Sequence, residues 1–104
     1  MILTTTEKVP NKEVTQILGI ARGSTVRARN IGRDIFAGLK NIIGGEIEEY
    51  SQLLNLSRDQ AMERMVLDAQ KMGADAIVNI RLTTSMVMET TSEVLAYGTA
   101  VKLS

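Results

Sequence analysis

The sequence predicts a small α+β protein in which one long helix packs on a mainly antiparallel three-stranded sheet. Three observations favour this class: apolar residues recur at helical spacing over 47–72, and two segments with strand-like alternation follow, at 74–83 and 93–103. At 104 residues the chain has the usual length of one domain with one core, so residues 1–104 are expected to form a single domain. The predicted order is β-α-α-β-β, built around a β-α-β-β two-layer unit.

The N-terminal part is predicted to be β-structure. Residues Ile2–Thr6 favour a short leading strand, and Pro10 indicates a break because proline has no backbone N–H. A longer strand is predicted over 13–21. Gly23-Ser24 is interpreted as a turn or bulge, after which residues 25–29 continue the strand in a bent form.

Two helices are predicted next. Asn30 is a suitable N-cap for a short helix with apolar positions over 31–43, which ends at Gly44-Gly45. The longer helix keeps one phase over roughly 26 residues. Its stripe consists of Ile47, Tyr50, Leu54, Ala61, Met65, Ala69 and Met72, with Arg58 in the one missing place. Residues 57–60 also fit a capping box that would start a separate helix at Ser57, although the unbroken phase favours one helix.

The last two strands have apolar residues on both sides. Polar residues 88–92 are predicted to make the turn between them. In the final strand, one side carries Leu95, Tyr97, Val101 and Leu103, and the other carries Val94, Ala96, Gly98 and Ala100. The small residues on this second side would let a helix pack closely.

This two-sided apolar character predicts self-association. One helix covers one face of a sheet, so the opposite face must meet water or a partner. The sequence places apolar residues on that outer face as well, namely Ile17, Ala21, Ile77 and part of the Val94/Leu95 alternation. Copies of the chain that shield one another would hide this surface, so a homo-oligomer is expected, with a copy number that these patterns leave open.

Composition excludes several classes of chemistry. The twelve basic and twelve acidic side chains cancel, so there is no net charge to attract nucleic acid or an anionic membrane. The chain has no Cys and no His, which removes thiolate sites and the commonest general base. With no signal-peptide pattern and no apolar run of the roughly 20 residues that span a bilayer, a cytoplasmic location without membrane partners is expected. We expect no enzymatic activity, and no cofactor is indicated.

Two groups of side chains have metal-binding chemistry. Glu46, Glu48 and Glu49 cluster at the start of the long helix, where their oxygens could hold Mg²⁺ or Ca²⁺. The competing interpretation, which we favour, is that acidic side chains stabilise the positive end of the helix dipole. Four methionines are paired by spacing: Met62 with Met65, and Met86 with Met88. Thioethers bind Cu(I), but methionine more often fills gaps in a core that, as here, is only 3% aromatic.

A third group is basic. Arg22, Arg27, Arg29 and Arg33 could contact phosphates of a nucleotide or a nucleic-acid backbone. No aromatic residues for base stacking lie nearby, so nucleic acid is not expected. Ion pairs across a subunit interface with the glutamates at 46–49 are an alternative. Neither a Walker loop nor a G-x-G-x-x-G motif is present.

Several motifs along the chain resemble those of the YbjQ-like family of uncharacterised bacterial proteins. They are Leu18–Gly23, Arg33–Ala37, Gly44-Gly45 with Tyr50, Ala61–Met65, Met72–Val78 and Tyr97–Val101. The resemblance implies a dodecin-like β-α-β-β unit assembled as a ring of five, with short extra strands aiding assembly. The family carries a heavy-metal-binding label, but no ligand position carries over to a chain without Cys or His.

The leading hypothesis is therefore a ring-forming, non-enzymatic, cytoplasmic protein that binds a small ligand or ion at subunit boundaries. Two alternatives remain. One is a metal-binding protein that uses oxygen ligands, and the other binds phosphate or nucleic acid through the arginine cluster.

Overall fold

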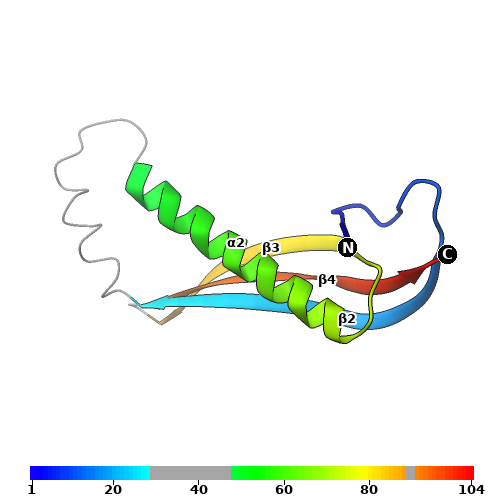
Figure 1. The fold of residues 1–104 in the computed structure, drawn as a ribbon. Helices are drawn as coiled ribbons and strands as arrows, with labels where there is room; N and C mark the ends of the chain where they lie inside the picture. Colours follow the sequence, from blue (N-terminus) through cyan, green and yellow to red (C-terminus); the bar gives the residue numbers. More distant parts are fainter. Residues whose placement is uncertain (29–47, 89–90) are drawn as a thin grey trace.

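The computed structural model describes residues 1–28, 48–88 and 91–104, which form one long helix on a sheet (Figure 1). The elements are β1 (Ile2–Leu3), β2 (Val14–Ala28), α2 (Glu48–Lys71), β3 (Ala76–Met88) and β4 (Thr91–Leu103). The strand order is β1-β3-β4-β2, with β1 parallel to β3 and the other pairs antiparallel. The α+β class is confirmed, but the described sheet is mixed and four-stranded, which corrects the mainly antiparallel three-stranded prediction. The predicted short helix over 31–43 lies outside the described residues.

The long helix is confirmed as a single element. Ser57 lies inside α2 and its side chain is buried, so the alternative helix start at this residue is wrong. The sequence pattern put Arg58 in the missing position of the apolar stripe, but Arg58 is exposed and Ser57 fills that position instead. The buried stripe therefore repeats every four residues, through Ser57, Ala61, Met65 and Ala69. No helix among the described residues is long and apolar enough to span a membrane.

Gly23 is not a turn but lies inside β2, paired with Ala96 and buried beneath α2. A Cβ placed on Gly23 would lie 2.3 Å from the backbone N of Met65 and 2.4 Å from the carbonyl O of Ala61. The helix backbone thus rests directly on the strand, and only glycine permits that approach. The interpretation of Gly23-Ser24 as a turn or bulge is therefore wrong, whereas the predicted continuation of the strand is confirmed as far as Ala28.

Irregularities in two strands decide which side chains face the helix. In β2 the register shifts between Ile17 and Gly19, which has a φ of 144°. Ile17 is consequently on the far face and 71% exposed, whereas Ala21 is fully buried under α2. In β3 a register shift brackets Asn79, and Ile77 is fully buried in the same core cluster. The outer-face prediction thus holds for Ile17 and is wrong for Ala21 and Ile77.

The main core lies between α2 and the sheet, and it includes the small residues of β4. Ala96 and Ala100 are fully buried and Gly98 is buried beside them, as the sequence predicted. A second, smaller cluster occupies the opposite face near the chain termini. It comprises Ala76, Val78 and Val101, with Val9 and Leu103 packed against them.

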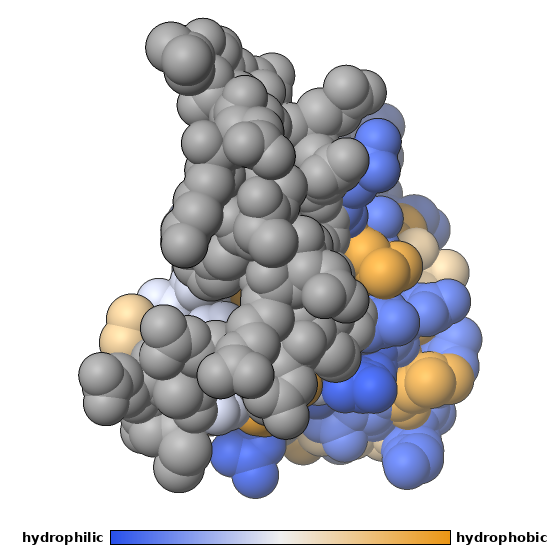
Figure 2. Space-filling view, turned by 90° about the vertical axis from the view of Figure 1, so that its left-hand side faces the viewer, coloured by the Kyte–Doolittle hydropathy of each residue, from blue (hydrophilic) through white to orange (hydrophobic). Residues whose placement is uncertain are grey.

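Most of the sheet face opposite α2 has no such cover from the described residues. We call the side chains of Ile17, Ile20, Val26, Leu95 and Tyr97 on this side the open face. The last four alternate along their strands with residues buried beneath α2, and Ile17 precedes the half-buried Leu18. Ile20 is 69% exposed and Val26 60% exposed. Hydrophobic residues also reach the surface among hydrophilic ones in the view of Figure 2.

Candidate functional site

A groove of about 790 Å³ lies between the N-terminal loop and the far face of the sheet. The loop supplies residues 7–13 to its wall, and the sheet supplies Val14, Ile17, Val78, Asn79, Thr99 and Val101. In Figure 1 this loop lies at the same end of the sheet as the C-terminus. The groove is therefore built by the end of the sheet where both termini meet.

Backbone hydrogen bonds to β3 fix the start of the loop. Thr4 donates its N–H to the carbonyl of Ile77 at 3.1 Å and accepts from the N–H of Ile80, also at 3.1 Å. The N–H of Asn79 donates to the carbonyl of Thr6 at 3.0 Å. Asn79 has a positive φ of 54°, a conformation that asparagine tolerates better than most residues. The bulge in β3 thus holds the loop and turns the Asn79 side chain toward solvent.

The other end of the loop is fixed to the C-terminus. The N–H of Lys12 donates to the carbonyl of Val9 at 3.2 Å in a turn whose Asn11 has a φ of 63°. Glu13 donates its N–H to Ser104 Oγ at 3.2 Å, and its carbonyl accepts from the Ser104 N–H at 3.0 Å. Both ends of the loop are therefore tied to the sheet, so the groove has a fixed frame.

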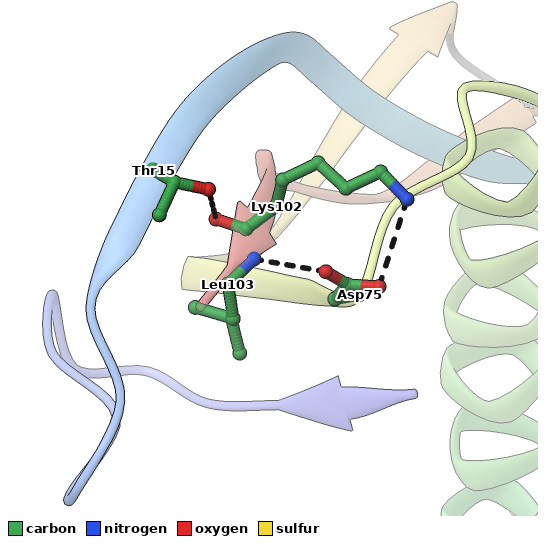
Figure 3. Close-up of polar contacts among 4 residues, drawn as sticks. All are labelled: Thr15, Asp75, Lys102 and Leu103. Atoms are coloured by element: carbon green, nitrogen blue, oxygen red, sulfur yellow. Dashed lines mark hydrogen bonds and ion pairs between the residues drawn. The ribbon is translucent and has the colours of Figure 1, made fainter.

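Asp75 strengthens this frame beside β4 (Figure 3). Its Oδ2 accepts a hydrogen bond from the backbone N–H of Leu103 at 2.9 Å, and its Oδ1 lies 3.7 Å from Lys102 Nζ. The hydrogen bond from Leu103, followed by the positive charges of Lys102 and Lys12, lowers the pKa of the Asp75 carboxyl from 3.8. The ionised carboxylate thus anchors the last residues of the chain. Thr15 adds a hydrogen bond from its Oγ1 to the carbonyl of Lys102 at 3.3 Å.

The groove has an apolar floor and a charged rim. Val78 and Val101 are buried beneath it, and Ile17 extends the floor toward solvent. The rim carries Glu7, Lys8, Lys12 and Glu13. The volume of the groove lies within the range of roughly 300–1,000 Å³ that is typical of small-molecule sites. The arrangement suits a largely apolar molecule with one polar or charged end.

The predicted metal-binding groups give no assembled site. Glu46 lies outside the described residues, as do the side chains of Glu48 and Glu49 at the start of α2. Among the described residues, no three of His, Cys, Asp and Glu gather where they could hold a metal ion.

The methionines do not supply a soft-metal site either. Met65 is fully buried in the main core and Met62 packs against that core, which is the gap-filling role. Met86 is 75% exposed, and a register shift separates it from Met88, whose side chain lies outside the described part. The thioethers within the described ranges thus serve the core or stand alone, and the chain has no Cys or His that could complete a soft-metal site with them.

The predicted arginine cluster is replaced by a different basic group. Arg22 and Arg27 both lie in β2, and Arg29 and Arg33 are outside the described ranges. Arg22 instead shares a hollow of about 300 Å³ with four residues of α2. We call this hollow the basic notch; it is lined by Arg22, Arg64, Leu67, Asp68 and Lys71. The sequence carried a signal for it, because positions 64, 68 and 71 fall on one helical stripe beside the buried one.

Comparisons with known proteins agree on one family. A family model described as "Putative heavy-metal-binding" (YbjQ_1) matches residues 1–104. A "UPF0145 protein" of Archaeoglobus fulgidus is 58% identical over 103 residues, which cover 99% of this chain and 95% of that one. A "UPF0145 protein" of Psychromonas ingrahamii is 54% identical over 103 residues, covering 99% and 98%. Relatives thus occur in archaea as well as bacteria.

A solved structure shares the fold. It is a protein of unknown function from the DUF74 family of Pediococcus pentosaceus, with a TM-score of 0.66. The two chains are 14% identical, and the match covers 100% of this chain and 98% of the other. At this identity the likeness concerns the arrangement of helix and strands alone.

Proposed function

The chain belongs to the YbjQ_1 family, and we propose that it is a non-enzymatic, self-associating protein that binds a small ligand in the groove beneath its N-terminal loop. One observation carries this proposal. Ile17 lines the groove and is also 71% exposed on the open face, so the apolar floor continues onto the uncovered sheet. A copy that covers the open face would therefore border the groove, and the proposed ligand would then lie at a subunit boundary.

The pairing of β2 with β4 makes the open face continuous. Ile20 is opposite Thr99, Arg22 is opposite Tyr97, and Ser24 is opposite Leu95. The next row pairs Val26 with Glu93. Burying the exposed part of each isoleucine would stabilise an assembly by about 1–2 kcal/mol, before the entropy of association is subtracted. Several such side chains on the open face therefore favour the binding of a second copy.

A closed ring gives every copy a neighbour on each side, and we propose five copies, as the family resemblance implied.

Charge also allows copies to meet, because a chain with a net charge of zero does not repel itself. We place the assembly in the cytoplasm, consistent with a chain that has no cysteine to oxidise.

The self-association is tested with Ile20→Glu and a matched control, Leu56→Glu. Both positions are exposed, at 69% and 49%, but Leu56 lies on α2 rather than on the open face. Sedimentation velocity at tens of micromolar should show an oligomer for the parent and for Leu56→Glu, and smaller species for Ile20→Glu. Equal sedimentation of all three proteins as oligomers would remove the open face from the interface.

The groove is tested with 1-anilinonaphthalene-8-sulfonate, an apolar probe with one anionic end. Saturable binding to the parent oligomer is expected, with weaker binding after Ile17→Trp fills the floor. Leu56→Trp, which adds the same side chain outside the groove, should bind the probe as the parent does. If Ile17→Trp binds the probe as tightly as the parent, the groove is not the site.

A further inference from the structure

We propose that the basic notch binds a phosphate group, either as orthophosphate or as a phosphate monoester. This site is separate from the groove and does not depend on the proposed function. The notch lies where α2 packs on the outer edge of β2, whereas the groove lies on the other side of the sheet. Its charged residues come from one strand position and one helical stripe.

Close packing of α2 on β2 fixes the position of the notch. Gly23 brings the helix backbone at Met65 against the strand, so Arg22 lies beside the next helical stripe. That stripe carries Arg64, Asp68 and Lys71, at spacings of four and three residues. The cluster therefore rests on two rigid elements that are held together by the core.

Two hydrogen bonds orient the Asp68 and Arg64 side chains of the notch. The backbone N–H of Arg22 donates to Asp68 Oδ2 at 3.0 Å, and Arg64 Nη1 donates to the carbonyl of Ser24 at 2.5 Å. Both bonds satisfy outward-facing backbone groups of β2, the edge strand of the described sheet. They also hold the Arg64 guanidinium at the notch, so less side-chain entropy is lost when an anion binds.

The balance of charge favours an anion. Three cationic residues and one acidic residue line the notch, a local excess of two positive charges in a chain whose net charge is zero. The one ion pair between described residues is Lys102 with Asp75, so the cations of the notch have no carboxylate within ion-pair distance there. Lys71 also offsets the negative end of the α2 dipole, which would otherwise oppose an anion.

The chemistry fits phosphate better than a simple halide. A phosphate monoester carries a charge of about −1.5 to −2 at neutral pH, which matches the local excess. Arginine donates two parallel hydrogen bonds to phosphate oxygens, whereas lysine contributes a point charge. The volume of about 300 Å³ leaves room for the phosphate group and for a small organic part next to Leu67.

A substitution at Asp68 distinguishes a phosphate site from a purely structural cluster, because only a phosphate site predicts a change in phosphate affinity. The Asp68 carboxylate opposes an incoming anion, while its hydrogen bond to Arg22 needs only an acceptor oxygen. Asp68→Asn keeps a side-chain oxygen and removes the negative charge. This variant should bind phosphate more tightly than the parent, whereas a cluster that serves only to seal the strand edge would gain nothing.

The test is a titration of isotopically labelled, full-length protein followed by the backbone amide resonances of Arg22, Ser24 and Leu67. Orthophosphate and glycerol 3-phosphate are added in separate experiments, with sodium chloride at matched ionic strength as the reference. Saturable shifts are expected with both phosphates and not with chloride. Tighter binding of glycerol 3-phosphate would identify a monoester as the natural ligand, and equal binding would identify the phosphate group alone.

The variants decide whether the notch is responsible. Arg22→Gln should weaken phosphate binding by about fivefold, the scale expected for an exposed charge pair. Arg58→Gln removes the same charge from the same helix outside the notch and should leave the affinity unchanged. Asp68→Asn should tighten binding. The proposal is overturned if phosphate gives no saturable shifts, or if Arg58→Gln weakens binding as much as Arg22→Gln.

Discussion

Replacing Gly23 by alanine tests the contact on which the fold depends. The added Cβ would lie 2.3 Å from Met65 N, 2.4 Å from Ala61 O and 2.7 Å from the carbonyl carbon of Arg64. All three obstacles are backbone atoms of α2, so no side chain can rotate out of the way. Restoring an ordinary contact requires the helix to move by about 1 Å, which loosens the buried stripe that packs on β2. Overpacking of this kind costs about 1–3 kcal/mol, and we expect the upper end.

The assay is urea unfolding at one fixed protein concentration, followed by circular dichroism. Gly23→Ala should lose about 3 kcal/mol of unfolding free energy, or roughly 12 °C or more in melting temperature. Gly98→Ala should lose less, because its nearest obstacle is the Cγ2 of the Ile77 side chain at 2.6 Å. Ser24→Ala, one residue away from Gly23 and partly exposed, should change stability by at most about 0.5 kcal/mol. A loss below 1 kcal/mol for Gly23→Ala would refute the close approach of helix and strand.

Two further predictions concern single polar contacts. Thr25 is buried, and its Oγ1 donates a hydrogen bond to the carbonyl of Ser57 at 3.1 Å. Thr25→Val removes this hydrogen bond and should cost about 1 kcal/mol of unfolding free energy. An unchanged urea midpoint would contradict this prediction. The folded state lowers the pKa of Asp75 below 3.8, so this carboxylate stabilises the fold above pH 3.8 and its contribution is lost as the pH falls through the lower, folded pKa. Asp75→Asn should therefore be less stable than the parent at neutral pH, with a difference that shrinks in acid below pH 3.8; a difference independent of pH would count against the ionised anchor.

The helix could be predicted from the sequence because its signal is long and periodic. Apolar spacing in one phase gave an element from 47 to 72, and α2 spans Glu48–Lys71. The small residues of β4 were also read correctly as the helix-packing side, since Ala96, Gly98 and Ala100 alternate with larger residues. Both inferences use only the spacing of apolar and small residues, which a single sequence shows directly.

The faces of β2 and β3 could not be predicted because alternation assumes a regular strand. A bulge at Gly19 and a left-handed residue at Asn79 each shift the phase, which moves Ala21 and Ile77 into the core. Gly23 was misinterpreted for a related reason, since a glycine that makes room for a helix looks like a turn or bulge glycine until the helix is placed. The packing partner, 38 or more residues away, is not visible locally.

The candidate sites were harder to predict than the elements. The groove is formed by a loop whose two ends are fixed to β3 and to the C-terminus, and only the fold brings those segments together. The basic notch joins Arg22 to residues 64–71, whereas the sequence suggested a cluster of arginines close together along the chain. The firmest functional inference from the sequence was the exclusion of some chemistry by composition, such as thiolate ligands.

Native mass spectrometry of the intact protein at tens of micromolar tests the central claim most directly, because it reports how many copies shield the open face. We expect a single dominant assembly whose mass is a multiple of 11.4 kDa, with five copies proposed. A spectrum dominated by the 11.4 kDa chain, together with cooperative unfolding of that single chain, would show that the uncovered sheet needs no partner and would contradict the account.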